Sequence, residues 1–170
     1  SLKMQKTDAI IFDLGGVILD IDYNLTRRAF EKLGVRDFNE MYSQAEADTL
    51  FRNLEKGRIN ERDFYAEFNH CTGLSLKPCQ IREAWNAMLL TFREKSLAFL
   101  GEINNKYRLF LLSNTNEIHY EMFKKVYHSQ KRFFAFEDLF EKAYYSFEMV
   151  KRKPDSGFSE FLLHINDLKP

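Results

Sequence analysis

Polar residues that could handle a phosphoryl group follow apolar runs at separate places in the sequence. Asp13 ends the stretch "AIIFD", and Ser113, followed by Asn114, ends "RLFLLS". Lys153 stands in "VKRKPD", directly before a proline. An aspartate can attack phosphorus, a hydroxyl with amides at a helix start can hold phosphoryl oxygens, and an ammonium can neutralise the developing charge. Together these residue types favour phosphoryl transfer through an aspartyl intermediate.

Each of these residues also has an ordinary structural explanation when it is taken alone. Aspartate is common in turns after strands, serine and asparagine are common at helix starts, and the run "KRK" is typical of a solvated surface. Gly15 and Gly16, which follow Asp13 almost at once, suit a loop whose backbone passes close to a phosphate or a metal ion. The chemical interpretation therefore depends on whether the fold brings these places together.

The apolar runs that precede these residues are predicted to be strands of a parallel sheet. Residues 8–13 and 108–113 are short apolar runs bounded by polar residues, and residues 142–146 are a weaker third candidate. Strand–helix alternation predicts an α/β fold with a Rossmann-like parallel sheet in a three-layer α/β/α arrangement. The carboxyl ends of such strands lie at one edge, so Asp13, Ser113 and Lys153 would converge on one crevice.

A long helical block, from about residue 24 to 106, separates the first two predicted strands. A crossover needs only about a dozen residues. A separate helical cap domain, residues 21–92, is therefore predicted to be inserted into a discontinuous core of residues 1–20 and 93–170. Within it, Gly57 is predicted to end one helix and Asn60 to cap the next. In "PCQIREAWNAML", the proline fits a first helical turn and the apolar spacing predicts a helix that reaches Leu89.

The charge balance and hydropathy of the sequence argue against some classes of partner. Lys+Arg and Asp+Glu both total 25, so nothing favours nucleic acid or an anionic membrane surface as the main partner. No apolar run approaches the ~20 residues that span a bilayer, and the first residues lack a signal-peptide pattern. Cys71 and Cys79 are predicted to be free thiols, and we expect a cytoplasmic protein.

The motifs "IIFDLGGVILDID", "LLSNTN" and "VKRKPD", in that order, resemble those of the haloacid dehalogenase superfamily of aspartate-nucleophile hydrolases. The similarity is greatest to the sugar-phosphate phosphatase-like branch, which has a helical cap after the first strand. It covers essentially the whole chain. The resemblance implies a Mg²⁺-dependent phosphatase that acts on a small phosphorylated metabolite, such as a sugar phosphate, through an aspartyl-phosphate intermediate.

The resemblance also implies roles for individual residues. Asp13 would be the nucleophile and a Mg²⁺ ligand, and the backbone carbonyl of Gly15 would be a second ligand. The phosphate would be bound by Ser113, Asn114 and Gly16. Lys153 would pair with the nucleophile and with the substrate.

Two features depart from the family pattern. Many phosphatases of the superfamily have a general acid/base aspartate two positions after the nucleophile, where this chain has Gly15, which has no proton to donate. Nothing in the spacing brings Asp20 or Asp22 within reach as a substitute. The pattern also continues with a strand whose acidic pair completes the Mg²⁺ site, and the sequence stops at "HINDLKP" before it. We therefore expect the C-terminal strands to be missing, "AIIF" to lie at an exposed sheet edge and turnover to be impaired.

Other functions remain open from the sequence. Dehalogenation of a small haloacid is disfavoured, because the aromatic residue expected near Asp13 for that chemistry is absent. A phosphoacceptor signalling module would also combine aspartate, Ser/Thr and lysine at strand ends, but the long insertion argues against it. A catalytically silent binding relative would fit Gly15 and the missing acidic strand. In each case Tyr23, Phe51 and Trp85 of the predicted helical domain are candidates for contacts with a ligand.

Overall fold

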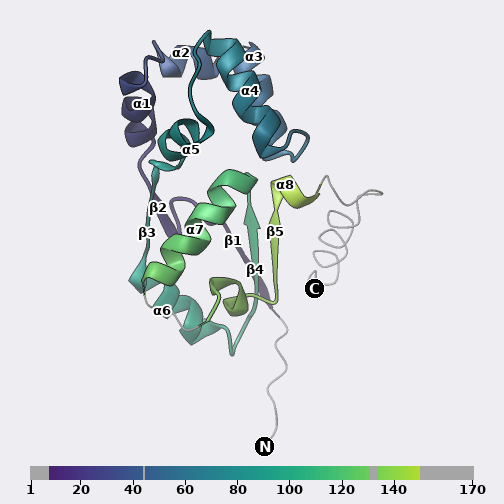
Figure 1. Cartoon of the computed structure of the whole chain (residues 1–170). Coiled ribbons are helices and arrows are strands. Elements are labelled where there is room, and N and C mark those ends of the chain that lie inside the picture. Colours follow the sequence, from purple (N-terminus) through teal and green to yellow (C-terminus); the bar gives the residue numbers. More distant parts are fainter. Residues whose placement is uncertain (1–7, 44, 131–133, 150–170) are drawn as a thin grey trace, which may run out of the picture.

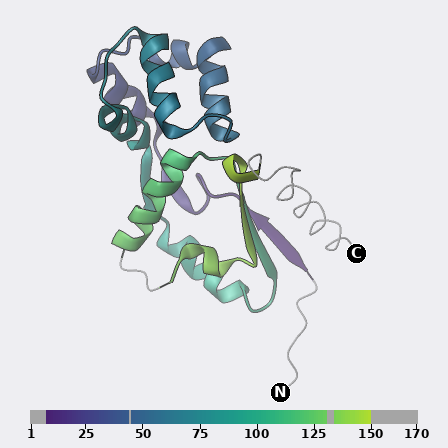
Figure 2. The ribbon, with the colours of Figure 1, turned by 45° about the vertical axis from the view of Figure 1, so that its right-hand side comes forward.

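The computed structural model describes residues 8–43, 45–130 and 134–149 (Figure 1). In this part of the chain, a sheet and its helices form one body. A cluster of helices lies above one end of the sheet, the end at which its strands lead into helices (Figures 1 and 2). Lys153 lies outside the described residues.

Parallel strands form the sheet, in the order β1–β4–β5. Their bounds are Ala9–Phe12 for β1, Arg108–Ser113 for β4 and Lys142–Tyr145 for β5. Ile11 pairs with Phe110, and Leu111 pairs with Ala143. The predicted strands and their parallel arrangement are confirmed. Among the described strands of the sheet, β1 pairs with β4 alone, and Ile11 is 44% exposed.

Helices that follow the strands pack on one face of the sheet. They are α6 (Glu94–Ile103), α7 (Glu117–Ser129), the 3-10 helix η1 (Phe136–Leu139) and the short α8 (Ser146–Met149). Leu109 and Leu111 share a side of β4 and lie in one hydrophobic cluster with Leu100 and Phe123 of α6 and α7. Phe110, on the other side, belongs to a separate small cluster. A parallel sheet packed against helices is the α/β, Rossmann-like fold expected from the sequence.

The cluster of helices above the sheet, called the helical cap below, consists of α1 to α5. The bounds are α1 (Tyr23–Lys32), α2 (Phe38–Ser43), α3 (Ala45–Glu55), α4 (Glu61–Thr72) and α5 (Pro78–Asn86). Aromatic rings fill much of its core: Phe30 stacks on both Phe38 and Phe68, with 4.9 Å between ring centroids in each pair. As predicted, Asn60 caps α4, and its side chain accepts a hydrogen bond of 2.8 Å from the Asp63 N–H.

An antiparallel two-stranded ribbon joins the helical cap to the sheet, and the sequence analysis did not predict it. It is formed by β2 (Leu19–Ile21) and β3 (Leu89–Phe92). The prediction that the helix in "PCQIREAWNAML" reaches Leu89 is wrong, because α5 ends at Asn86 and Leu89 pairs with Ile21. Thr91 and Phe92 favour a strand, but their backbone partners come from a distant segment that a local window does not reveal.

No helix in the described ranges is long and apolar enough to cross a lipid bilayer. Cys71 in α4 is partly buried and Cys79 in α5 is exposed. Both are free thiols, as predicted from the sequence.

Candidate active site

Asp13 lies directly after β1, where the sheet borders a cavity that also reaches the helical cap. Its side chain is exposed, and its Oδ1 accepts a hydrogen bond of 2.7 Å from the Leu14 N–H. This bond orients the carboxylate through Oδ1, which makes Oδ2 the oxygen better placed to act on a substrate.

The backbone after Asp13 folds into a tight loop that ends in β2. The Leu19 N–H donates to the Leu14 carbonyl at 3.0 Å, and the Gly16 N–H donates to the Leu19 carbonyl at 2.8 Å. Gly16 has a φ of 76°, a conformation that favours glycine. Because the Gly16 N–H is used inside the loop, any contribution of Gly16 to phosphate binding comes from close approach of its backbone.

Gly15 lies where this loop passes the ribbon. A Cβ placed on Gly15 would come within 2.7 Å of Cδ1 of Ile21, so a larger residue would displace that side chain. The hydrogen bonds that close the loop use the carbonyls of Leu14 and Leu19. The Gly15 carbonyl, which the resemblance assigns to the metal ion, therefore has no part in closing the loop.

Ser113 and Asn114 lie at the carboxyl end of β4, the strand next to β1. Ser113 is 3% exposed, whereas Asn114 is exposed. The chain then enters α7, whose N-cap is Asn116; the Asn116 side chain accepts a hydrogen bond of 2.9 Å from the His119 N–H. The N-terminus of α7 carries the partial positive charge of the helix dipole, which favours an anion at this edge of the sheet.

Two adjoining cavities lie between these residues and the helical cap. The larger has a volume of about 1100 Å³ and is lined by Asp13 and Gly16, and the smaller has a volume of about 200 Å³ and is lined by Ser113. Gly15 and Asn114 line both cavities, which therefore meet beside them. The structure thus brings these five predicted site residues around one joined space.

The end of α3 brings charged residues to the same space, and the sequence analysis did not single them out. Glu55 lines both cavities, and Lys56 and Arg58 line the larger one. Gly57 has a φ of 69° and lets the chain turn after the helix. The glycine was readable as a helix stop, but the position of the turn beside Asp13 depends on how the cap packs on the sheet.

Ser146, the first residue of α8, connects the end of α3 to the sheet. Its Oγ accepts a hydrogen bond of 3.0 Å from the Thr115 N–H and lies 2.9 Å from the carbonyls of both Thr115 and Glu55. A hydroxyl has one proton, so it donates to one of these carbonyls at a time. The contact holds the backbone of Glu55 beside the strand that leads to the site.

The smaller cavity is partly aromatic. Tyr23, Phe51 and Trp85 of the helical cap all line it. Burial, with a smaller contribution from Tyr42, raises the pKa of Tyr23 to about 12, so its hydroxyl is protonated at neutral pH. The three aromatic residues considered for ligand contacts therefore lie together on one side of the site.

His119, in the first turn of α7, is a buried titratable residue that lines the smaller cavity. It is 7% exposed, and its ring stacks on Trp85 with 4.6 Å between centroids. Its Nδ1 lies 2.8 Å from Oδ1 of Asn86. Burial lowers the pKa of His119 to about 3, so the ring is neutral at pH 7. His119 was not a predicted site residue; its place in the first turn of the helix that follows β4 was the signal that could have found it.

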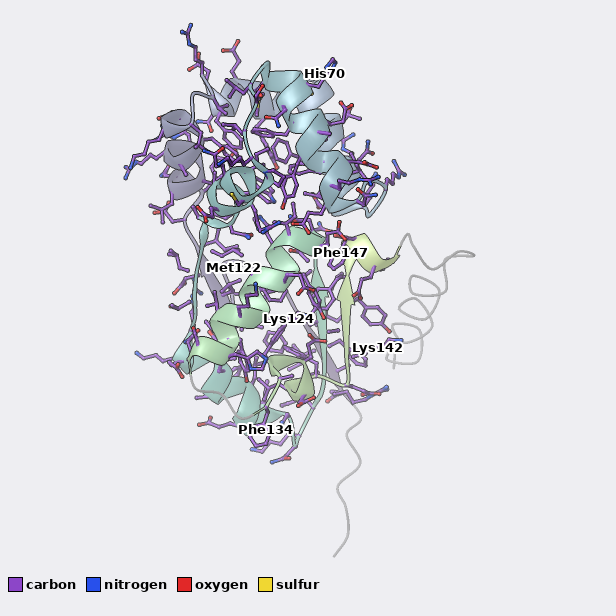
Figure 3. All side chains as sticks on the ribbon, in the orientation of Figure 1. His70, Met122, Lys124, Phe134, Lys142 and Phe147 are labelled. Atoms are coloured by element: carbon purple, nitrogen blue, oxygen red, sulfur yellow. The ribbon has the colours of Figure 1, made fainter. Side chains whose placement is uncertain are left out.

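The other candidates from the sequence lie elsewhere. Asp20 forms an ion pair with Arg93, with 2.6 Å between Oδ1 and Nε, and Asp22 caps α1. Neither lines the two cavities, so neither replaces the acid missing at position 15. His70, which was not a site candidate, lies near the end of α4 that points away from the sheet (Figure 3). Lys153 is not among the described residues, and its predicted role stays a prediction.

Comparisons with known proteins place the chain among phosphatases and related hydrolases. No family model matches the sequence. A D-ribitol-5-phosphate phosphatase of Bacteroides thetaiotaomicron is 26% identical over 165 residues, which are 95% of this chain and 78% of that protein.

Solved structures of haloacid dehalogenase (HAD) family proteins are similar over nearly the whole chain. One is a HAD family enzyme of Bacteroides thetaiotaomicron in complex with magnesium and inorganic phosphate; it is 31% identical, has a TM-score of 0.79, and the match covers 94% of this chain and 78% of that one. Another is a predicted HAD-like hydrolase of Porphyromonas gingivalis, which is 30% identical with a TM-score of 0.76, over 98% and 79% of the two chains.

Proposed function

Because this chain belongs to the haloacid dehalogenase family and is a hydrolase, we propose that it removes phosphate from a small phosphorylated metabolite. The observation that carries the proposal is the exposed carboxylate of Asp13 at the carboxyl end of β1. Asp13 lines one cavity together with Asn114 and the cations of Lys56 and Arg58. A nucleophile, an amide and two positive charges around one space suit a phosphate ester.

In the proposed reaction, Asp13 attacks the phosphorus atom. A bond forms between Oδ2 and phosphorus while the bond to the alcohol oxygen breaks, and the alcohol leaves with that oxygen. Water then attacks the aspartyl-phosphate, releasing inorganic phosphate and restoring the carboxylate. The Leu14 N–H holds Oδ1 throughout.

The phosphate is held, in this proposal, at the carboxyl end of β4. Ser113 and Asn114 contribute a hydroxyl and an amide, and the N-terminus of α7 adds its dipole. Lys153 is proposed to neutralise Asp13 and the substrate, as the resemblance implies. Lys56 and Arg58 add positive charge from the helical cap.

The end of β1 offers two oxygen donors that suit part of a magnesium site. Among the described residues no group of three or more His, Cys, Asp or Glu side chains could hold a metal ion. Mg²⁺, however, typically binds one or two carboxylates and substrate phosphate while keeping several waters. We propose that the Asp13 carboxylate and the Gly15 carbonyl hold it. When bound, the ion offsets negative charge on the phosphoryl group.

The leaving alcohol needs a proton, and Gly15 has none to give. Glu55 is a carboxyl group that lines both cavities, between the phosphate end and the aromatic end of the site. We assign Glu55 to protonate the leaving oxygen. The proton would then return to Glu55 from the water that hydrolyses the aspartyl-phosphate.

The substrate is proposed to be a phosphorylated sugar or polyol. A similar protein is a D-ribitol-5-phosphate phosphatase, and the smaller cavity, about 200 Å³, has room beside the phosphate end for a short carbon chain. The helical cap, proposed as a domain of residues 21–92, would then select the substrate, because α1, α3 and α5 supply most of the side chains opposite the sheet.

A silent binding relative is the second candidate, because Gly15 replaces the usual acid. A Mg²⁺-dependent assay with 4-nitrophenyl phosphate separates it from an enzyme. The same assay tests the assignment of Asp13.

Asp13→Asn is expected to abolish hydrolysis of 4-nitrophenyl phosphate, because the amide is no nucleophile, a loss of about a thousandfold or more in kcat. Asp20→Asn is the matched control: it removes a carboxylate from the neighbouring strand β2 but only breaks the ion pair with Arg93. Its activity should stay close to that of the native protein. Retained turnover in Asp13→Asn would overturn the proposed function.

A further inference from the structure

The Nε2 atom of His119 is a buried polar atom for which none of the described residues supplies a partner. It is shielded from solvent and makes no hydrogen bond with any described residue. Buried polar atoms in folded proteins nearly always have partners, because an unsatisfied one loses its interactions with water. Within the described part of the chain, the atom is therefore open to a partner such as a ligand or a water molecule.

Neighbouring residues fix the ring on several sides. Trp85 stacks on it with an angle of 17° between the planes, and the backbone N–H of His119 donates to Asn116. Trp85 Nε1 also lies 3.4 Å from Oδ1 of Asn116. Such contacts hold a side chain in one orientation before any ligand arrives.

The contact with Asn86 decides the tautomer of the ring. Oδ1 of Asn86 only accepts hydrogen bonds, so Nδ1 of His119, 2.8 Å away, carries the proton and donates. The ring is neutral, so Nε2 then has a lone pair and no hydrogen. It can accept a hydrogen bond from a hydroxyl or an N–H, but it offers nothing to a carbonyl or a phosphate oxygen.

The cavity beside His119 continues the site at Asp13. His119 lines the smaller cavity with Ser113 and Trp85, and Gly15 and Asn114 connect that cavity to the one that contains Asp13. A volume of about 200 Å³ is room for several water molecules, at about 30 Å³ each, or for a short carbon chain. The part of a substrate that enters it is the organic part, on the far side of the phosphate end.

We infer that Nε2 of His119 accepts a hydrogen bond from a hydroxyl group of the phosphorylated sugar or polyol that is proposed as the substrate. The inference rests on the proposed function, since it assigns the organic part of the same substrate. The apolar walls formed by Phe51 and Trp85 bury the carbon chain, and His119 selects for a hydroxyl on it.

Two variants separate the ligand contact from a structural role. His119→Asn keeps an amide N–H near Nδ1, where it can still donate to Asn86, but removes the ring atom Nε2. His119→Gln extends an amide oxygen toward the position of Nε2 and restores an acceptor. Each variant of the full chain is assayed with Mg²⁺ on ribitol 5-phosphate and on 4-nitrophenyl phosphate, which has no hydroxyl group.

The measured quantity is the ratio of kcat/KM for ribitol 5-phosphate to kcat/KM for 4-nitrophenyl phosphate. In His119→Asn this ratio is expected to fall by about tenfold or more, mainly through KM, because a site built to bind a hydroxyl loses that discrimination. His119→Gln is expected to recover most of it. An unchanged ratio, or equal losses with both substrates, would mean that water or packing explains Nε2 and would overturn the inference.

The experiment also distinguishes failure of the inference from failure of the proposed function. If the native chain hydrolyses neither substrate, or if Asp13→Asn remains active, the proposed function fails and the inference falls with it. If 4-nitrophenyl phosphate is hydrolysed through Asp13 but ribitol 5-phosphate is not, the inference alone is overturned.

Discussion

The neutral ring of His119 has an energetic consequence of its own. An unfolded chain exposes the ring, whose usual pKa is 6.5, whereas burial in the folded protein lowers this pKa to about 3. Below pH 6.5 the unfolded state therefore binds a proton that the native state does not. The stabilisation linked to the uncharged ring is present above that pH and is lost as the pH falls toward the folded-state pKa.

His119→Gln is expected to weaken the acid sensitivity of the fold, because glutamine does not titrate. Between about pH 6.5 and pH 4, the unfolding free energy of the native protein should fall faster than that of the variant, by up to about 1.4 kcal/mol for each pH unit. Urea unfolding at several pH values measures both slopes. Parallel curves for the two proteins would show that His119 is not buried in its neutral form.

At the residue scale, the sequence indicated the side of the candidate site at the strand ends better than the side at the cap. Asp13, Ser113 and Asn114 were readable because each follows an apolar run, and strand ends in a parallel sheet meet at one edge. The pair formed by Asn86 and His119 was not readable. Its two residues come from the cap and from α7, and only packing of the cap on the sheet brings them within 2.8 Å.

Among the helices of the cap, α3 is the one that lines both cavities. Its last residue, Glu55, stands beside both cavities, and Ser146 at the start of α8 contacts its carbonyl. This helix therefore places the proposed proton donor, which belongs to the cap, beside the sheet. The chain turns at Gly57, and the residues on either side of it, Lys56 and Arg58, line the larger cavity.

Glu55→Gln is expected to slow hydrolysis of ribitol 5-phosphate by about a hundredfold, because an amide cannot supply the proton that an alkoxide needs. Hydrolysis of 4-nitrophenyl phosphate should fall much less, since its phenolate leaves without protonation. Steady-state kinetics with both substrates measure the difference. Glu31→Gln, which only breaks the exposed pair with Arg27, serves as the control. Equal losses with the two substrates would contradict the assignment of Glu55.

The sequence predicted elements with a local pattern and missed those that depend on a partner. The strands β1, β4 and β5 are apolar runs, and Asn60 and Pro78 mark the starts of α4 and α5. The ribbon of β2 and β3 has no such pattern. Leu90 and Thr91 are exposed. The helical spacing had predicted a helix as far as Leu89, but pairing with β2 makes this segment a strand.

At the scale of the whole molecule, the described residues form two main hydrophobic clusters, one in the helical cap and one between the sheet and its helices. Ile118 of α7 belongs to the cap cluster, although α7 packs on the sheet. Thr26 of α1 adds a polar link within the cap: its hydroxyl donates to the Trp85 carbonyl and accepts from the Met88 N–H, both at 3.0 Å. The packing of the cap is therefore connected to the packing of the residues that line the site.

Phe30→Ala is expected to lower the free energy of unfolding by about 3–5 kcal/mol, because it empties a fully buried site between two stacked rings. Urea unfolding followed by the fluorescence of Trp85, the single tryptophan, measures the change. Phe99→Ala is the control, since Phe99 is 51% exposed, and its effect should stay within about 0.5 kcal/mol. A small effect of Phe30→Ala would mean that the aromatic core repacks around the vacancy.

The ribbon of β2 and β3 also has a consequence for the folding reaction. The first paired residues of β1 and β4, Ala9 and Arg108, are separated by about a hundred positions, but once Leu19 pairs with Phe92 the path between them shortens to about thirty. Closing the shorter loop costs about 1 kcal/mol less entropy. The ribbon, which itself closes a loop of about seventy residues, thus brings the two ends of the cap together and shortens the path for the parallel pairing. Chains that form it early should reach the β1–β4 pairing with a lower kinetic barrier.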